Sequence, residues 1–89
     1  MFVIELVYEK EVEEIDKHLA AHIKFLEENH EKGIFIASGP KIPRTGGIII
    51  ADLDSRENLE KIMEEDPFVK NEVCSYKITE FSAMYKYKK

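Results

Sequence analysis

Residues 12–26, VEEIDKHLAAHIKFL, decide the fold because they carry the clearest periodic pattern in the chain. Apolar residues recur here in steps of three and four, which places them along one side of a helix: Val12, Ile15, Leu19, Ile23 and Leu26. His22 lies on the same stripe. A buried polar ring without a hydrogen-bond partner costs about 1–3 kcal/mol. The pattern therefore predicts a helix that faces the core, and a partner for His22 from elsewhere in the chain.

Outside this helix, which we expect to run from Val12 to Lys32 and to end at Gly33, the pattern changes to short apolar runs. Strands are predicted at residues 2–8, 34–38, 47–53 and 75–87, the last with a bulge between Ile78 and Phe81. A second helix is predicted from a cap at Asp54 or Ser55 to Glu64, with Asp66-Pro67 beyond its end. Residues 39–46 form a Gly/Pro loop, and residues 68–73 a connection that contains at most a short helical turn.

The resulting element order, β-α-β-β-α-β, predicts one domain over residues 1–89 with a ferredoxin-like α+β fold. This fold has an antiparallel four-stranded sheet with both helices on one face. The strands carry apolar residues on both of their faces, so the uncovered face of the sheet needs a partner. The simplest partner is a second copy of the chain, and we expect a homodimer with its sheets packed face to face.

Composition narrows the class of protein. The net charge of −5 is moderate and gives no support to nucleic-acid binding. No run approaches the roughly 20 apolar residues of a membrane span, and the N-terminus reads directly into a strand without a signal-peptide pattern. Cys74 is the single cysteine, which is typical of a reducing compartment. We therefore expect a cytoplasmic protein that contacts neither nucleic acid nor membrane.

His22 and Asp66 are the candidate catalytic residues. Asp66 follows the second helix and can fold back toward the first helix. A carboxylate beside an imidazole selects its tautomer and raises its basicity, as in general bases. The alternative is a buried His–Asp hydrogen bond that only ties two elements together, or an Asp66 that accepts nearby backbone N–H groups at the end of the helix.

Ser38, Gly39 and Pro40 are the candidate substrate-binding residues. A glycine lets a ligand approach the backbone, and the Ser38 hydroxyl can bond to a ligand or to His22. The alternative is an ordinary turn after a strand. His18 and His22 have the spacing of a metal-binding pair, but no third ligand is evident, so we expect neither a metal nor another cofactor.

Taken in order, His22, Gly33, Ser38-Gly39-Pro40 and Asp66-Pro67-Phe68 resemble the YciI-like (YCII-related) domain family. The resemblance covers nearly the whole chain. It implies a ferredoxin-like fold of the dimeric α/β-barrel type, a small cytoplasmic protein, and an active site built on His22 and Asp66 with residues 38–40 beside it. Some relatives are implicated in chloride elimination from hydroxylated aromatic rings.

The chain departs from the family pattern at Leu19, because many relatives carry an arginine three residues before the histidine. Lys17, His18 and Arg44 are candidates to supply that charge. The leading interpretation is a cofactor-independent enzyme that acts on a small organic molecule by elimination, isomerisation or hydrolysis. The alternatives are a dimeric module that binds or senses a small ligand without chemistry, and an accessory domain for protein–protein contact in which the pair is structural.

Overall fold

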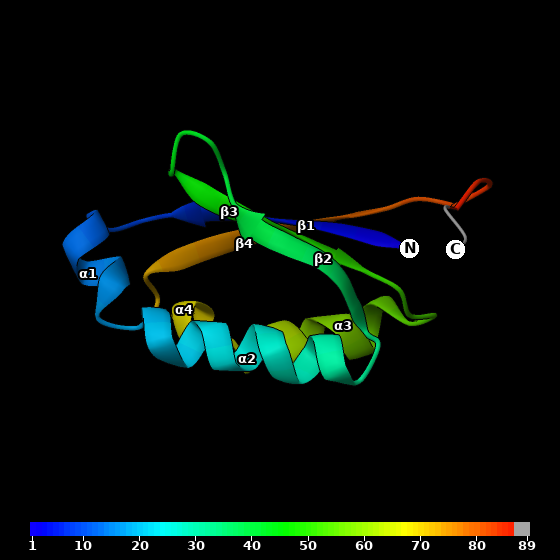
Figure 1. Ribbon diagram of the computed structural model, residues 1–89, viewed down its shortest axis with the longest axis horizontal. Coiled ribbons are helices and arrows are strands. Elements are labelled where there is room, and N and C mark those ends of the chain that lie inside the picture. Colours follow the sequence, from blue (N-terminus) through cyan, green and yellow to red (C-terminus); the bar gives the residue numbers. More distant parts are fainter. Residues whose placement is uncertain (87–89) are drawn as a thin grey trace.

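Figure 1 shows a sheet with helices α2, α3 and α4 packed against one of its faces. The computed structural model describes residues 1–86. The elements along the chain are β1 (Phe2–Tyr8), α1 (Val12–Asp16), α2 (Leu19–Glu31), β2 (Phe35–Pro40), β3 (Gly46–Ala51), α3 (Arg56–Met63), α4 (Pro67–Lys70) and β4 (Cys74–Glu80). The four strands are ordered β2-β3-β1-β4, and every neighbouring pair is antiparallel. The predicted ferredoxin-like α+β architecture is confirmed.

Strand β1 lies inside the sheet and anchors the core. Its alternate residues Phe2, Ile4 and Leu6 are buried, because side chains of a strand point to its two faces in turn. Ile49 of β3 and Ile78 of β4 lie opposite Ile4 and share its face. Leu59 and Met63 of α3 cover this layer from the helix side. The core is therefore a single layer between the sheet and its helices.

The first helical segment differs from the prediction, because it is divided into α1 and α2. Lys17 and His18 separate the two helices, and His18 is the N-cap of α2 with φ −111° and ψ 3°. The break changes the phase of the stripe. On α2, the buried residues are His22, Phe25 and Asn29, whereas the predicted core residue Ile23 is 44% exposed.

The predicted helix ends are confirmed where local chemistry sets them. Gly33 has a φ of +75°, and the N–H groups of Gly33 and Ile34 donate to the carbonyls of His30 and Asn29. This is a Schellman motif, which satisfies the last carbonyls of a helix. Ser55 is the cap of α3, because its side chain accepts from the backbone N–H of Asn58.

Two strand predictions were wrong at their ends. Gly39 and Pro40 belong to β2 together with Ser38, rather than to the loop, because β2 is an edge strand, where a proline is tolerated. Strand β4 ends at Glu80, opposite Phe2, since β1 offers no partner beyond that point. The register of β4 is regular, and the irregularity lies instead in β2 between Phe35 and Ala37. Tyr87, the last residue of the predicted strand, lies outside the described residues.

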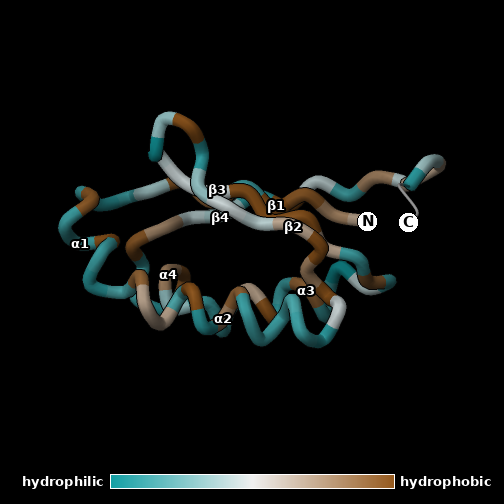
Figure 2. The backbone as a smooth tube through the Cα atoms, viewed as in Figure 1, coloured by the Kyte–Doolittle hydropathy of each residue, from teal (hydrophilic) through white to brown (hydrophobic). Residues whose placement is uncertain are grey.

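No helix in residues 1–86 is both long and apolar enough to cross a membrane. The sheet face opposite the helices carries apolar residues, among them Val3 and Val7 of β1 and Ile48 and Ile50 of β3. A hydrophobic segment also marks the loop between β2 and β3, where Ile42 is 99% exposed (Figure 2).

Candidate functional site

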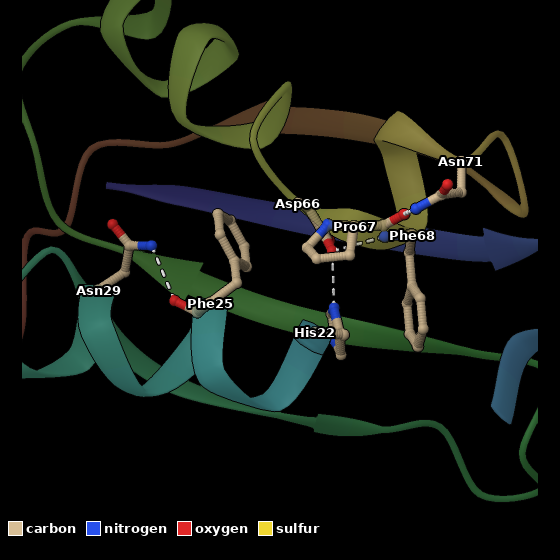
Figure 3. A network of polar contacts seen from close by, with 7 residues as sticks. All are labelled: His22, Phe25, Asn29, Asp66, Pro67, Phe68 and Asn71. Atoms are coloured by element: carbon tan, nitrogen blue, oxygen red, sulfur yellow. Dashed lines mark hydrogen bonds and ion pairs between the residues drawn. The ribbon is translucent and has the colours of Figure 1, made fainter. Parts of the chain in front are cut away.

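The site is centred on His22, in the first turn of α2, and Asp66, the N-cap of α4. The two atoms that meet are Nδ1 of His22 and Oδ1 of Asp66, at 2.8 Å (Figure 3). His22 is 7% exposed and Asp66 is fully buried. An ionised carboxylate only accepts hydrogen bonds, so Nδ1–H donates and Nε2 of the neutral ring keeps a free lone pair. This is the arrangement of an imidazole that can take up a proton.

Asp66 is also the N-cap of α4, a role that the sequence pattern offered as an alternative to the contact with His22. Its Oδ1 also accepts from the backbone N–H of Phe68 at 2.9 Å, so the side chain caps α4, with Pro67 in the first helical turn. The local cap and the long-range pairing with His22 therefore coexist on one oxygen. The cap fixes the carboxylate in the position that the imidazole meets.

The other oxygen of Asp66, Oδ2, is buried and has no hydrogen-bond partner within residues 1–86. The charge of this carboxylate is therefore sparsely compensated, since an unpaired buried polar atom is costly. The charge also acts on a neighbour. Burial raises the pKa of the Cys74 thiol to about 12, and the negative charges of Asp66 and Glu9 add to the effect.

Aromatic packing holds the plane of the imidazole. The rings of His22 and Phe68 are stacked with centroids 3.8 Å apart and planes 10° apart. Phe25 lies farther along the same helix, with its centroid 6.4 Å from that of His22. Because Phe68 also supplies the N–H that fixes Asp66, helix α4 positions both the carboxylate and the ring surface against His22.

A cavity of about 260 Å³ lies beside His22, between α2 and strands β2 and β3. Most of its lining is apolar, and its polar side chains are Tyr8, His22, Ser38 and Arg44. Gly39 and Pro40 also line it, so the structure brings His22 and the three predicted binding residues to one pocket. Asp66 lies behind the imidazole rather than on the cavity wall. The predicted stripe residues Leu19, Ile23 and Leu26 line this cavity, and Leu19 and Leu26 also pack against the edge of the core.

Ser38 meets a histidine that the sequence analysis did not select for this site. Its Oγ lies 2.9 Å from Nε2 of His30, in the last turn of α2. His30 also packs edge-on against Phe35, with centroids 6.0 Å apart. The available signal was the spacing of eight residues between His22 and His30, which is close to two helical turns. Within residues 1–86, no group of three or more His, Cys, Asp or Glu side chains is arranged to hold a metal.

Arg44 reaches the cavity from the loop after β2. Its Nε donates to the Tyr8 hydroxyl at 2.9 Å, and its Nη2 donates to Oδ1 of Asp16 at 2.6 Å. The guanidinium carbon also lies 5.5 Å from the centroid of the Tyr8 ring. The hydrogen bonds to Asp16 and Tyr8 raise the pKa of Arg44 above its ordinary value. A permanent positive charge is therefore held at the cavity wall.

Comparison with known proteins identifies the family of this chain. The profile of the YCII-related domain matches residues 1–82. The chain belongs to the YCII-related domain family. No curated protein gives a significant match. Among solved structures, this YCII-related domain is similar to 5-chloro-2-hydroxyhydroquinone dehydrochlorinase from Burkholderia phenoliruptrix AC1100, in complex with 2,5-dihydroxybenzoquinone. The TM-score is 0.75 at 19% identity, over 92% of this chain and 94% of the other.

This YCII-related domain lines its cavity with Leu19, at the position where the family resemblance implied an arginine. Of the three candidates for a replacement charge, Arg44 lines the cavity. Lys17 instead forms an exposed ion pair with Glu14 at 2.9 Å, and His18 is the N-cap of α2.

Proposed function

We propose that this protein is a cofactor-independent enzyme that acts on a small organic molecule, with His22 as the general base. In the proposed reaction, Nε2 takes a proton from the bound molecule. The electron pair left behind forms a double bond and expels a leaving group, or moves the double bond along the molecule. Asp66 orients the ring through Nδ1 and stabilises the imidazolium that forms. Elimination or isomerisation follows from the same first step, and hydrolysis follows if Nε2 deprotonates a water molecule.

The observation that carries this proposal is the 2.8 Å contact of His22 with Asp66 at the wall of a mainly apolar cavity. An apolar cavity with few polar groups is the usual form of a small-molecule site. Ser38 and the backbone of Gly39, on the same cavity wall, are proposed to bind an oxygen of the substrate. The similar solved structure is named as a dehydrochlorinase of a hydroxylated ring, which favours elimination among the reaction types.

The test measures turnover with and without the base. Chloride release from 5-chloro-2-hydroxyhydroquinone and from a panel of halogenated, hydroxylated single-ring compounds is compared between the wild type and His22→Gln. We expect the rate of the variant to be about 10²–10⁴-fold lower, because this is the usual contribution of a general base. His18→Gln is the matched control, since His18 lies one helical turn away and does not line the cavity. Wild-type turnover by His22→Gln would contradict the proposal.

The alternative function is a small-ligand binding or regulatory module without catalysis. The observation that favours it is the pairing of polar groups at the cavity with protein partners: Ser38 with His30, and Arg44 with Tyr8 and Asp16. Under this alternative, single-ring compounds bind the wild type, none is converted, and His22→Gln changes affinity alone.

We also propose that the protein is a cytoplasmic homodimer that packs through its open sheet face. The apolar residues of that face support this, because large uncovered apolar patches usually mark interfaces. Light scattering tests it. We expect the wild type to have twice the mass of one chain and Ile50→Glu to be a monomer, while the exposed helix variant Lys24→Glu stays a dimer. A monomeric wild type would refute the proposed assembly.

A further inference from the structure

The charge of the cavity wall is opposite in sign to that of the whole chain. The chain has a net charge of −5, yet among residues 1–86 Arg44 is the only one lining the cavity that carries a permanent formal charge. In the described part of the chain, no aspartate or glutamate lines the cavity. A positive charge at an apolar wall attracts an anion strongly, because few other dipoles compete there.

The guanidinium of Arg44 is held in place but not saturated. Arginine has five N–H donors in a rigid plane. The hydrogen bonds to Tyr8 and Asp16 use Nε and one hydrogen of Nη2, and no further acceptor is found within residues 1–86. The remaining donors on Nη1 and Nη2 are therefore available. Because two partners already order the side chain, a ligand that binds it loses less conformational entropy.

Asp16 does not cancel this role. It lies at the end of α1, just before the break at Lys17 and His18, and its side chain is 47% exposed. Solvent therefore screens its charge. Asp16 contacts only Nη2, so it fixes the orientation of the guanidinium and leaves Nη1 free.

The sheet register gives the position of Arg44 relative to the other polar groups. Ser38 lies in the same row as Ile49 and Ile4, whereas Arg44 is bonded to Tyr8, four residues along β1. Four strand residues span about 13 Å. His22 lies three residues after Leu19, in the first turn of α2, and Arg44 is bonded to Asp16 just before this helix. His30 meets Ser38 in the last turn of the same helix. The cavity therefore has a cation near one end, a hydroxyl near the other, and the imidazole between them, closer to the cation.

We propose that Arg44 is the anion-binding residue of this cavity, and that the cavity binds a small single-ring molecule carrying one ionised oxygen, as a carboxylate or a phenolate. The volume of about 260 Å³ lies just below the roughly 300–1,000 Å³ of sites for drug-sized ligands, which suits a single ring. The apolar wall contacts the ring, and Arg44 binds the ionised oxygen. That this molecule is also the substrate rests on the proposed function.

The experiment compares benzoate with benzamide, which have the same shape but differ in charge. Affinities are measured by NMR titration of the wild type, Arg44→Gln and Arg44→Lys. We expect the wild type to bind benzoate roughly ten- to a hundredfold more tightly than benzamide. This is the gain in affinity that one or two charge-assisted hydrogen bonds contribute. Arg44→Gln removes this preference and leaves benzamide affinity unchanged, and Arg44→Lys keeps part of it. Thermal unfolding confirms that both variants are folded.

Arg56→Gln is the matched control, because Arg56 is an exposed arginine of α3 that does not line the cavity. It should bind benzoate as the wild type does. Equal affinity of the wild type for the two probes, no binding of either probe, or a preference that survives in Arg44→Gln would overturn the proposal. His22→Gln separates this result from the proposed function, since it should lower turnover about 10²–10⁴-fold and keep the preference for benzoate.

Discussion

The imidazole of His22 lies flat against the phenyl ring of Phe68, with centroids 3.8 Å apart and planes inclined by 10°. Phe68 in turn meets Tyr8 edge-on at 6.4 Å, and Tyr8 binds Arg44. The proposed base and the cavity-wall cation are thus connected through two aromatic rings. This packing gives the imidazole a fixed orientation in addition to its hydrogen bond with Asp66.

Replacement of Phe68 tests this packing. We expect Phe68→Leu to keep the fold and the Asp66 cap, because leucine retains the backbone N–H, but to let the His22 ring turn. Turnover should fall, while the free energy of unfolding decreases by about 1–2 kcal/mol from imperfect refilling of the core. The measurements are urea unfolding and the NMR signals of the imidazole nitrogens. A ring that stays as ordered as in the wild type would show that Asp66 alone holds it.

Asp66→Ala should destabilise the protein more than the loss of an ordinary cap. It removes the α4 cap, worth about 0.5–2 kcal/mol, and leaves Nδ1–H of His22 buried without a partner, at about 1–3 kcal/mol. Ser55→Ala is the matched control, because it removes only the exposed cap of α3. In urea unfolding, the free energy of unfolding of Asp66→Ala should be clearly lower than that of Ser55→Ala. Equal losses would mean that the contact with His22 contributes nothing to stability.

The buried thiol of Cys74 predicts a dependence of stability on alkaline pH. The pKa of this thiol is raised from 9.0 to about 12, mainly by burial and further by the negative charges of Asp66 and Glu9. A raised pKa means that the folded state keeps a proton that the unfolded state loses. The stabilisation is thus complete below pH 9 and is lost as the pH rises toward 12, by up to about 1.4 kcal/mol per pH unit.

Urea unfolding between pH 8 and about pH 10.5 measures this effect. The free energy of unfolding should fall more steeply above pH 9 in the wild type than in Cys74→Ala, which lacks the thiol. The comparison removes the contributions of lysines and tyrosines, which both proteins share. Parallel curves for the two proteins would exclude the thiol as the cause.

Two glycines at the cavity predict opposite outcomes. A Cβ on Gly46 would lie 1.9 Å from the carbonyl oxygen of Leu6, so Gly46→Ala forces β3 away from β1. A Cβ on Gly39 would meet no atom within 4 Å. We expect Gly46→Ala to lower the melting temperature strongly or to prevent folding, and Gly39→Ala to unfold as the wild type does. A Gly46→Ala protein of wild-type stability would show that β1 and β3 can separate without cost.

Local signals predicted the elements well and their junctions less well. Gly33 and Ser55 act through backbone groups a few residues away, and each ends or begins a helix where the sequence indicated. Pro67 was predicted to stop the second helix, whereas it begins the short helix α4. The break at Lys17 and His18 was missed, because the apolar stripe continues through it. The end of β4 was missed as well, since it depends on where β1 begins.

The sequence indicated several residues of the candidate site but not all of their contacts, because these contacts join segments that are distant along the chain. The family resemblance indicated His22 and Asp66, but their contact spans 44 residues and follows from how α4 is placed. Ser38 was assigned a ligand or His22 as its partner, whereas β2 brings it to His30. Arg44 was one of three candidates for a charge at the cavity, and the hydrogen bonds to Tyr8 and Asp16 bring it to the wall.

The sequence alone determined the order of helices and strands and the ferredoxin-like class, because periodicity and capping depend on neighbours along the chain. Tertiary structure decided which polar groups meet. The phase of α2 after its break turns Leu19, Ile23 and Leu26 toward a cavity, and the cap of α4 brings Asp66 to His22. These contacts depend on rigid elements packed across the sheet, and a shift of one residue in phase or register would give every side chain different neighbours.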